Sequence, residues 1–127
     1  MANLADSMPF STLMGVEITE ATTMNVIGQL VVRADLCTAG NILHGGAIMA
    51  FADALGAIGA FLNLGEGAHT TTLESKTNFL GAAPEGVTVI GVATPAHSGK
   101  STSVWHTKIT RADGKAVALV TQTQMVL

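Results

Sequence analysis

Charged residues are scarce in this chain of 127 residues, where Asp, Glu, Lys and Arg make up only 12%. An average soluble domain has about twice that share. Six residues are Lys or Arg and the net charge is −3, so the sequence lacks the basic surface that nucleic-acid binding requires. Hydrophobic residues reach 48%, and an open apolar surface favours association. We therefore expect a homodimer or homotetramer.

Cysteine and proline are also rare. The single cysteine, Cys37, excludes an internal disulfide and indicates a reducing compartment. The chain has three prolines and no repeat or linker, which favours one domain over residues 1–127. The first ten residues, MANLADSMPF, lack the basic and apolar regions of a secretory signal. We expect a cytoplasmic protein.

The most apolar run, residues 47–62, contains one charged side chain, Asp53. It is shorter than the roughly 20 residues that a membrane span needs, so we expect no membrane partner. The four histidines are scattered without the spacing of metal ligands, and we expect neither a metal site nor a cofactor.

The order of residue types predicts one long helix among several strands. Residues 45–64 are rich in Ala, Leu, Met and Phe, which favour helix. The other expected elements are a short helix (9–15), a hairpin (16–33) turning at Met24 and Asn25, an irregular segment (34–43), and strands at 69–80, 86–97, 101–111 and 115–127. Asp113-Gly114 is a strong hairpin signal between the last two strands.

The long helix is apolar on every side, and such a helix has to be buried. A curved antiparallel sheet of five or six strands can wrap around part of it, with a second copy of the chain covering the rest. The expected fold class is therefore α+β.

A first candidate site lies at the start of this helix, where His44 is followed by Gly45 and Gly46. Backbone N–H groups in the first helical turn lack intrahelical acceptors and attract negative charge. Glycines allow a ligand oxygen to come close to these donors, as in an oxyanion site. The alternative is a Gly-Gly turn that only begins the helix.

The lone acid within the helix is the second candidate. Burying an unpaired carboxylate costs several kcal/mol, so a sequence selected only for packing would place Ala or Leu at position 53. Ionisable groups in apolar surroundings are often tuned for chemistry. The alternative is an acid that caps a neighbouring loop or helix.

These two candidates cannot act together within one chain. Gly46 and Asp53 are separated by about 10.5 Å along a helix that rises 1.5 Å per residue. Two antiparallel copies of the helix would instead bring Asp53 of one chain near Gly45 and Gly46 of the other. The sequence therefore predicts a site at a dimer interface.

The HGG motif at 44–46, the acid nine residues after the histidine and the later strand TTTLESKTNFL resemble the hotdog-fold thioesterases of the phenylacetic-acid-degradation (PaaI-like) group. The resemblance covers the chain from about Pro9 to Leu127. It implies hydrolysis of an acyl- or aroyl-coenzyme A thioester.

The resemblance also implies roles for individual residues. Asp53 acts as nucleophile or general base, and the Gly45 N–H of the neighbouring subunit polarises the carbonyl. His44 helps to shape the site together with Gly46, and the hydroxyl of Thr72, or of its neighbour Thr71, positions the water or the acid.

Two further regions follow from the same resemblance. Family members often carry Asn or Gln where this chain has Thr38, with Asn41 nearby but out of register. The turn at Ser98, Gly99, Lys100 and Ser101 can meet the phosphates of coenzyme A, or it is an ordinary polar hairpin turn. It imitates the end of a phosphate-binding P-loop, but position 94 is Thr rather than Gly.

Two other functions remain open at this stage. A hydroxyacyl-thioester dehydratase or hydratase also pairs a histidine with an acid, and a non-catalytic domain could bind acyl-CoA. On the strand from 72 to 79, alternation predicts that Thr72, Glu74, Lys76 and Asn78 share one face.

Overall fold

The structure is a computed structural model that describes residues 3–127. A 3-10 turn (η1, Leu4–Ser7) and a short helix (α1, Pro9–Met14) precede the β1–β2 hairpin, and a second 3-10 turn (η2, Ala34–Leu36) and two short strands lead into the long helix. The remaining elements are β1 (Glu17–Thr22), β2 (Asn25–Val31), β3 (Cys37–Thr38), β4 (Ile42–Leu43), α2 (Gly45–Leu62), β5 (Thr70–Phe79), β6 (Thr88–Ser98), β7 (Thr102–Arg111) and β8 (Ala116–Val126).

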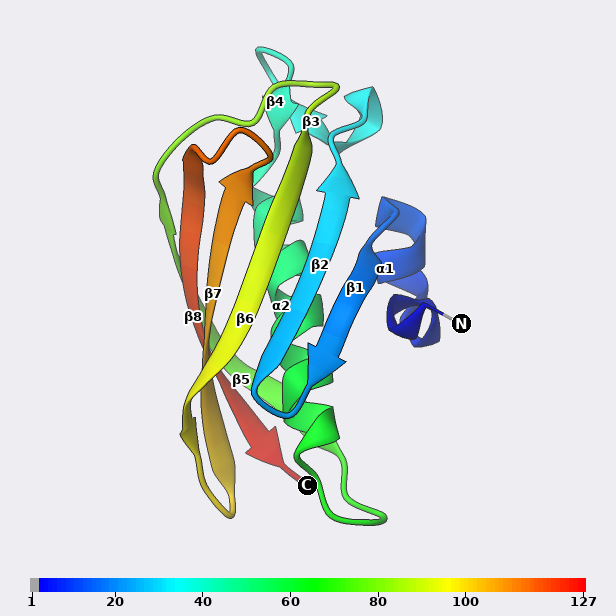
Figure 1. The fold of residues 1–127 in the computed structure, drawn as a ribbon, viewed down its shortest axis with the longest axis vertical. Helices are drawn as coiled ribbons and strands as arrows, with labels where there is room; N and C mark the ends of the chain where they lie inside the picture. Colours follow the sequence, from blue (N-terminus) through cyan, green and yellow to red (C-terminus); the bar gives the residue numbers. More distant parts are fainter. Residues whose placement is uncertain (1–2) are drawn as a thin grey trace.

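Six strands form one antiparallel sheet in the order β1-β2-β6-β7-β8-β5, and β3 pairs with β4 in a separate two-stranded ribbon. The large sheet curves around α2, which runs along its concave side (Figure 1). This is the predicted arrangement of one central helix wrapped by a curved antiparallel sheet. Strands β1 and β5 are the two edges of the sheet.

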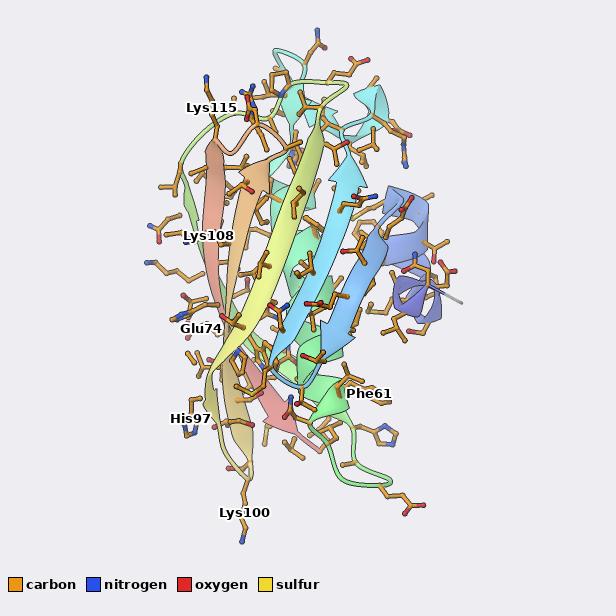
Figure 2. All side chains as sticks on the ribbon, in the orientation of Figure 1. Phe61, Glu74, His97, Lys100, Lys108 and Lys115 are labelled. Atoms are coloured by element: carbon orange, nitrogen blue, oxygen red, sulfur yellow. The ribbon has the colours of Figure 1, made fainter. Side chains whose placement is uncertain are left out.

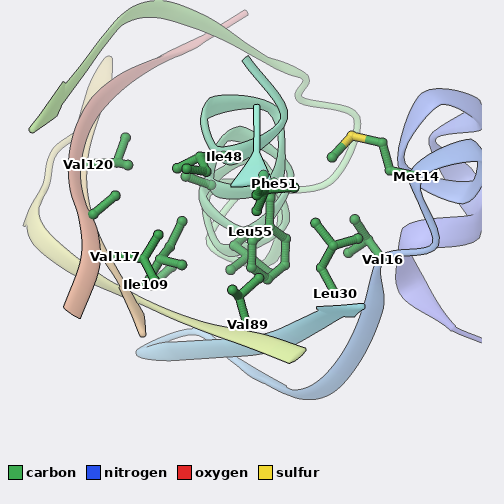
Figure 3. Packing of buried hydrophobic residues seen from close by; sticks show 14 of the residues in the cluster. Met14, Val16, Leu30, Ile48, Phe51, Leu55, Val89, Ile109, Val117 and Val120 are labelled. Atoms are coloured by element: carbon green, nitrogen blue, oxygen red, sulfur yellow. The ribbon is translucent and has the colours of Figure 1, made fainter. Parts of the chain in front are cut away.

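The core lies between α2 and the concave face of the sheet. Phe51 and Leu55 of α2 are fully buried and face side chains of β2, β6 and β7 (Figure 3). Burying a side chain of this size contributes about 1.5–3 kcal/mol, so this face of α2 fixes the helix on the sheet.

Two glycines of α2 allow close contact with large buried side chains. A Cβ on Gly59 would overlap the ring of Trp105, and a Cβ on Gly56 would overlap the side-chain amide of Gln122. Both glycines therefore serve the packing of α2 against the sheet.

Most predicted boundaries are confirmed to within two residues. Helix α2 ends at Leu62 rather than at residue 64, because the side chain of Asn63 donates to the Gly59 carbonyl and to that of Thr23 (both 2.8 Å). Gly15 adopts a left-handed conformation (φ 86°) that ends α1. The turn predicted at Asp113-Gly114 is also present. The segment predicted as irregular (34–43) instead contains η2 and the β3–β4 hairpin, which turns at Gly40 and Asn41 (φ 84° and 57°).

The prediction that Thr72 shares a face with Glu74, Lys76 and Asn78 is wrong. The β5–β8 register shifts between Thr72 and Glu74, because β5 contains a β-bulge there. A bulge inserts one residue and reverses the alternation beyond it. Thr72 consequently faces the helix, and Glu74 is exposed on the outside of the sheet (Figure 2).

Helix α2 has one face that the chain itself leaves partly open. This open stripe of α2 follows the helical repeat along one side and consists of Gly46, Met49, Ala50, Asp53, Ala57 and Phe61. By length and composition α2 could cross a membrane, but half of it is buried inside this fold, as expected of a core helix. The stripe is the part of α2 available to a second chain.

Candidate active site

Asp53 lies halfway along the open stripe, and its carboxylate is held from the sheet side. The hydroxyl of Thr72 on β5 donates to Asp53 Oδ1 at 2.6 Å, a length typical of a charge-assisted hydrogen bond to a carboxylate. The amide Nε2 of Gln122 on β8 donates to the same oxygen at 3.2 Å. Neither alternative for the acid, a loop cap or a helix cap, is found.

A second glutamine extends this network. Gln124 Nε2 donates to Thr72 Oγ1 at 2.6 Å, and Thr70 Oγ1 lies 3.0 Å from Gln124 Oε1. Gln122 and Gln124 are 0% and 1% exposed, so the network is shielded from water on the sheet side. The chain thus supplies four polar side chains behind one carboxylate.

The other carboxylate oxygen of Asp53 is open. Both protein donors go to Oδ1, and within residues 3–127 Oδ2 has no donor yet is not among the buried unpartnered atoms. One oxygen is therefore anchored, and the other faces the open side of α2. A carboxylate in this state can attack an electrophile or accept a proton from water.

His44 caps the start of α2. Its Nδ1 accepts a hydrogen bond from the Gly46 N–H at 2.8 Å, so that N–H is already occupied. Across the described chain, no acceptor takes the N–H of Gly45. Of the two glycine amides, Gly45 is therefore the one available to an oxyanion or a carbonyl oxygen.

The space at this helix start is divided into two shallow cavities. One, of about 330 Å³, is lined by Gly45, Thr38 and the ring of Phe79. The other, of about 490 Å³, is lined by Gly46, His44 and Cys37. Thr38 therefore does lie beside Gly45, whereas the exposed Asn41 makes only a backbone contact, accepting from Glu85 N at 2.9 Å.

Cys37 is placed near this helix start but is poorly suited to nucleophilic chemistry. Burial raises the pKa of its thiol, and the carboxylates of Glu85 and Asp35 raise it further. The thiol donates to the Arg33 carbonyl at 3.3 Å. At neutral pH it stays protonated, and a thiol is a weak nucleophile compared with a thiolate.

Two predicted groups lie away from Asp53 in the same chain. Thr71 is exposed on the opposite face of β5 from Thr72. The exposed turn from Ser98 to Ser101 joins β6 to β7 at the end of the molecule where α2 finishes, and Lys100 is at its tip (Figure 2). Helix α2 begins at the other end (Figure 1).

Asp53 and Gly45 are also separated within one chain. They are eight residues apart on α2, or about 12 Å at 1.5 Å per residue. No single carbonyl group can touch both. In the part of the chain that the structure describes, no three His, Cys, Asp or Glu side chains gather as they would around a metal ion.

Comparison with known proteins identifies the family. Residues 40–118 match the model of the thioesterase superfamily. A protein of Mycobacterium tuberculosis named among the esterases (Rv1847) is 30% identical over 120 residues, which cover 92% of this chain and 85% of that protein. An esterase-named protein of Vibrio cholerae (VC_A0580) is 38% identical over 78 residues, 61% of this chain, and the match spans only 51% of its length.

Solved structures agree with this match. The thioesterase HI1161 of Haemophilus influenzae has a TM-score of 0.91 and 26% identity, covering 98% of this chain and 87% of its own. Two further structures, at 21% and 23% identity, show a likeness of fold. The Escherichia coli PaaI protein has a TM-score of 0.90, with coverage of 98% and 88%. A hypothetical thioesterase of Streptococcus pneumoniae, solved with coenzyme A, has 0.81, with 88% and 85%.

The family match confirms the resemblance on which the sequence predictions relied, and the sheet wrapped around α2 agrees with it. This chain belongs to the thioesterase superfamily and has the hotdog fold of its PaaI-like members.

Proposed function

We propose that the protein hydrolyses an acyl- or aroyl-coenzyme A thioester to the free acid and coenzyme A. Membership of the thioesterase superfamily supports a thioester hydrolase, and the coenzyme A in the Streptococcus pneumoniae structure supports that carrier. The proposal rests mainly on the state of the Asp53 carboxylate. Its Oδ1 accepts hydrogen bonds from Thr72 and Gln122, and its Oδ2 is open.

In the proposed site Asp53 acts on a thioester held by a second copy of the chain. In one route its open Oδ2 attacks the carbonyl carbon and releases the coenzyme A thiolate, and water then hydrolyses the resulting anhydride to the free acid. In the other route Oδ2 takes a proton from a water that attacks the carbonyl carbon, and the coenzyme A thiolate leaves. The Gly45 N–H of the neighbouring subunit donates a hydrogen bond to the carbonyl oxygen and stabilises the negative charge that develops there. One such preorganised donor is typically worth about 3–4 kcal/mol of the barrier.

The edge strand β5 supports the required dimer. Its outer edge is free in the single chain, and an unpaired edge is a template for another strand. Near the start of β5, Thr72 contacts Asp53. At the end of β5, the ring of Phe79 lies 3.1 Å from the position of a Cβ on Gly45. Two β5 edges paired antiparallel about their middle would bring Asp53 of one chain toward Gly45 of the other.

The same arrangement gives the Lys100 turn a role in binding coenzyme A. Because this turn lies at the end of the molecule opposite Gly45 (Figures 1 and 2), an antiparallel partner would bring its Lys100 to the Gly45 end. Asp53 and Lys100 would then come from one subunit and Gly45 from the other. A lysine ammonium suits the phosphates of coenzyme A.

The acyl group has an apolar cavity within reach. A space of about 630 Å³ lies between the η1 turn and the C-terminal half of α2, lined by Ala57, Phe61, Leu4 and Met8. Ala57 follows Asp53 by one helical turn on the open stripe. Thr70, which also lines this cavity, belongs to the Asp53 network.

A thiol-release assay over a panel of acyl-CoA thioesters tests the proposal. We expect the wild-type protein to release coenzyme A and Asp53→Asn to lose at least about 100-fold in kcat, since general-base or nucleophilic help is removed. Circular dichroism and thermal unfolding of the variant should match wild type, because asparagine still accepts from Thr72.

Other results would reassign the protein. Tight binding of acyl-CoA without thiol release would indicate a binding domain, and an enoyl product from a 3-hydroxyacyl-CoA would indicate a dehydratase. For a confirmed hydrolase, single turnover in ¹⁸O water separates the two mechanisms, since label enters Asp53 only through a covalent intermediate.

A further inference from the structure

Two buried glutamines of β8 lie behind Asp53, on the side away from the open stripe of α2. We propose that Gln122 and Gln124 are positioning residues, which hold the carboxylate so that Oδ1 is anchored and Oδ2 alone is presented to the substrate. This inference rests on the proposed hydrolysis. It gives a purpose to two polar side chains that occupy the core face of a strand.

Gln124 sets the direction of the Thr72 hydroxyl. Its Nε2 can only donate, so at 2.6 Å it occupies a lone pair of Thr72 Oγ1. The hydroxyl hydrogen then points along the 2.6 Å contact to Asp53 Oδ1. If the Gln124 amide were reversed, its Oε1 would accept the Thr72 hydroxyl hydrogen. Thr72 Oγ1 and Asp53 Oδ1 would then face each other at 2.6 Å with no hydrogen between them. The observed orientation is therefore the one that keeps Thr72 donating to the carboxylate.

Gln122 reaches the same oxygen by a different route. Its Nε2 lies 3.2 Å from Asp53 Oδ1 and 3.5 Å from the Asp53 backbone carbonyl. Its Oε1 is buried without a hydrogen-bond partner, against Gly56. A reversed amide would put that oxygen against the carboxylate. An unpartnered buried carbonyl is retained here because the N–H group is needed on Asp53.

This arrangement decides between two roles considered for Thr72. A hydroxyl has one hydrogen, and in this network it is directed at Asp53. Thr72 therefore anchors the acid and has no hydrogen left to orient an attacking water. Reaction at Asp53 is restricted to Oδ2, the oxygen on the open side of α2.

The first test replaces Gln122 with methionine, which has a similar shape and no amide. A merely structural role predicts unchanged or higher stability, because Gln122→Met removes the unpartnered oxygen. A positioning role predicts, in addition, a fall in kcat of about 10- to 100-fold with little change in KM, since misplaced catalytic groups lose rate at this scale. Gln122→Glu is the matched control for shape with polarity retained, and it should not restore kcat, because a second carboxylate would face Asp53.

The second test is a double-mutant cycle between Gln124→Met and Thr72→Val. If Gln124 acts through the Thr72 hydroxyl, each single variant lowers kcat, and the double variant is no slower than Thr72→Val alone. Thr72→Ser keeps the hydroxyl and should retain most of the activity. Independent, multiplicative losses in the double variant would overturn the role assigned to Gln124, and full kcat in Gln122→Met would overturn that of Gln122.

The outcome can be separated from failure of the proposed function. If wild type hydrolyses no thioester in the panel, the proposed function fails, and crystal structures then decide the positioning role. The inference predicts that the Asp53 carboxylate turns or loses a single orientation in Gln122→Met and Gln124→Met. It is overturned if the carboxylate keeps the wild-type orientation in both variants.

Discussion

At the residue scale, the proposed chemistry depends on the Asp53 carboxylate, whose two oxygens have different hydrogen-bond partners. Asp53 was predictable because a lone acid in an apolar helix is costly without a purpose. The glutamines were missed, although β8 carried a signal. Its alternating core positions Ala118 and Val120 continue into Gln122 and Gln124, and polar residues on the buried face of a strand require partners.

The prediction of which hydroxyl meets Asp53 shows the limit of sequence patterns. Thr71 and Thr72 are the same residue type. The residues around the bulge after Thr72 are ordinary strand residues, so the sequence does not mark its position. The contact itself depends on the pairing of β5 with β8, which strand alternation alone does not reveal. The side-chain cap from His44 to Gly46 was also not predicted, and it leaves Gly45 as the free donor.

A residue-scale prediction concerns the acyl cavity. Ala57→Leu extends a side chain into this cavity, one helical turn beyond Asp53, without changing the carboxylate. We expect kcat/KM for long acyl groups to fall by about tenfold or more relative to the shortest substrate, as pocket volume discriminates at this scale. Thiol release over an acyl-CoA series measures it, with Ala112→Leu in the exposed β7–β8 turn as the control. An unchanged preference would place the acyl group elsewhere.

At the element scale, α2 is the core helix and also carries Asp53 and Gly45, the two residues on which the proposed site depends. Its length and its burial were predictable from composition, because a helix apolar on all sides has to be covered. The open stripe could not be located in advance, since apolarity on every side marks no particular face. Phe51 and Leu55 pack on the sheet (Figure 3) and decide the rotation of the helix. Asp53 consequently lies half-buried on the open stripe of α2.

The element-scale prediction is that Gly59→Ala destabilises the fold. Alanine is favoured over glycine in a helix interior by about 1 kcal/mol, but its Cβ would overlap the buried ring of Trp105. Overpacking in a tight core costs about 1–3 kcal/mol, so the net change should be a loss of stability. Urea unfolding measures it.

Gly65→Ala is the matched control, because a Cβ at Gly65 meets nothing within 4 Å. Its free energy of unfolding should stay within about 0.5 kcal/mol of wild type. Equal or higher stability of Gly59→Ala would mean that the contact between α2 and Trp105 is looser than described.

At the scale of the whole molecule, the separation of Asp53 from Gly45 along α2 requires a second chain for the proposed chemistry. The low charge content, the free edge of β5 and the open stripe of α2 favour the same conclusion. The sheet wrapped around a helix was predictable from the order of elements. The pairing of two chains is proposed from these features of the single chain.

The two halves of the proposed site can be inactivated separately. Asp53→Asn removes the acid. Gly45→Pro removes the N–H, and proline is well tolerated at the first position of a helix. The extended backbone of His44 (φ −62°, ψ 137°) suits a residue before proline. Gly45→Ala, which keeps the N–H and also adds a Cβ near Phe79, controls for bulk.

The most direct measurement mixes these two variants. In a heterodimer of Asp53→Asn with Gly45→Pro, one site pairs an intact Asp53 with an intact Gly45 from the other chain. After equimolar unfolding and refolding together, thioesterase activity should return to as much as about a quarter of wild type, because half the dimers carry one working site of two. If the refolded mixture forms heterodimers and stays as inactive as its components, the acid and the glycine amide do not meet across two subunits, and the proposed site is wrong.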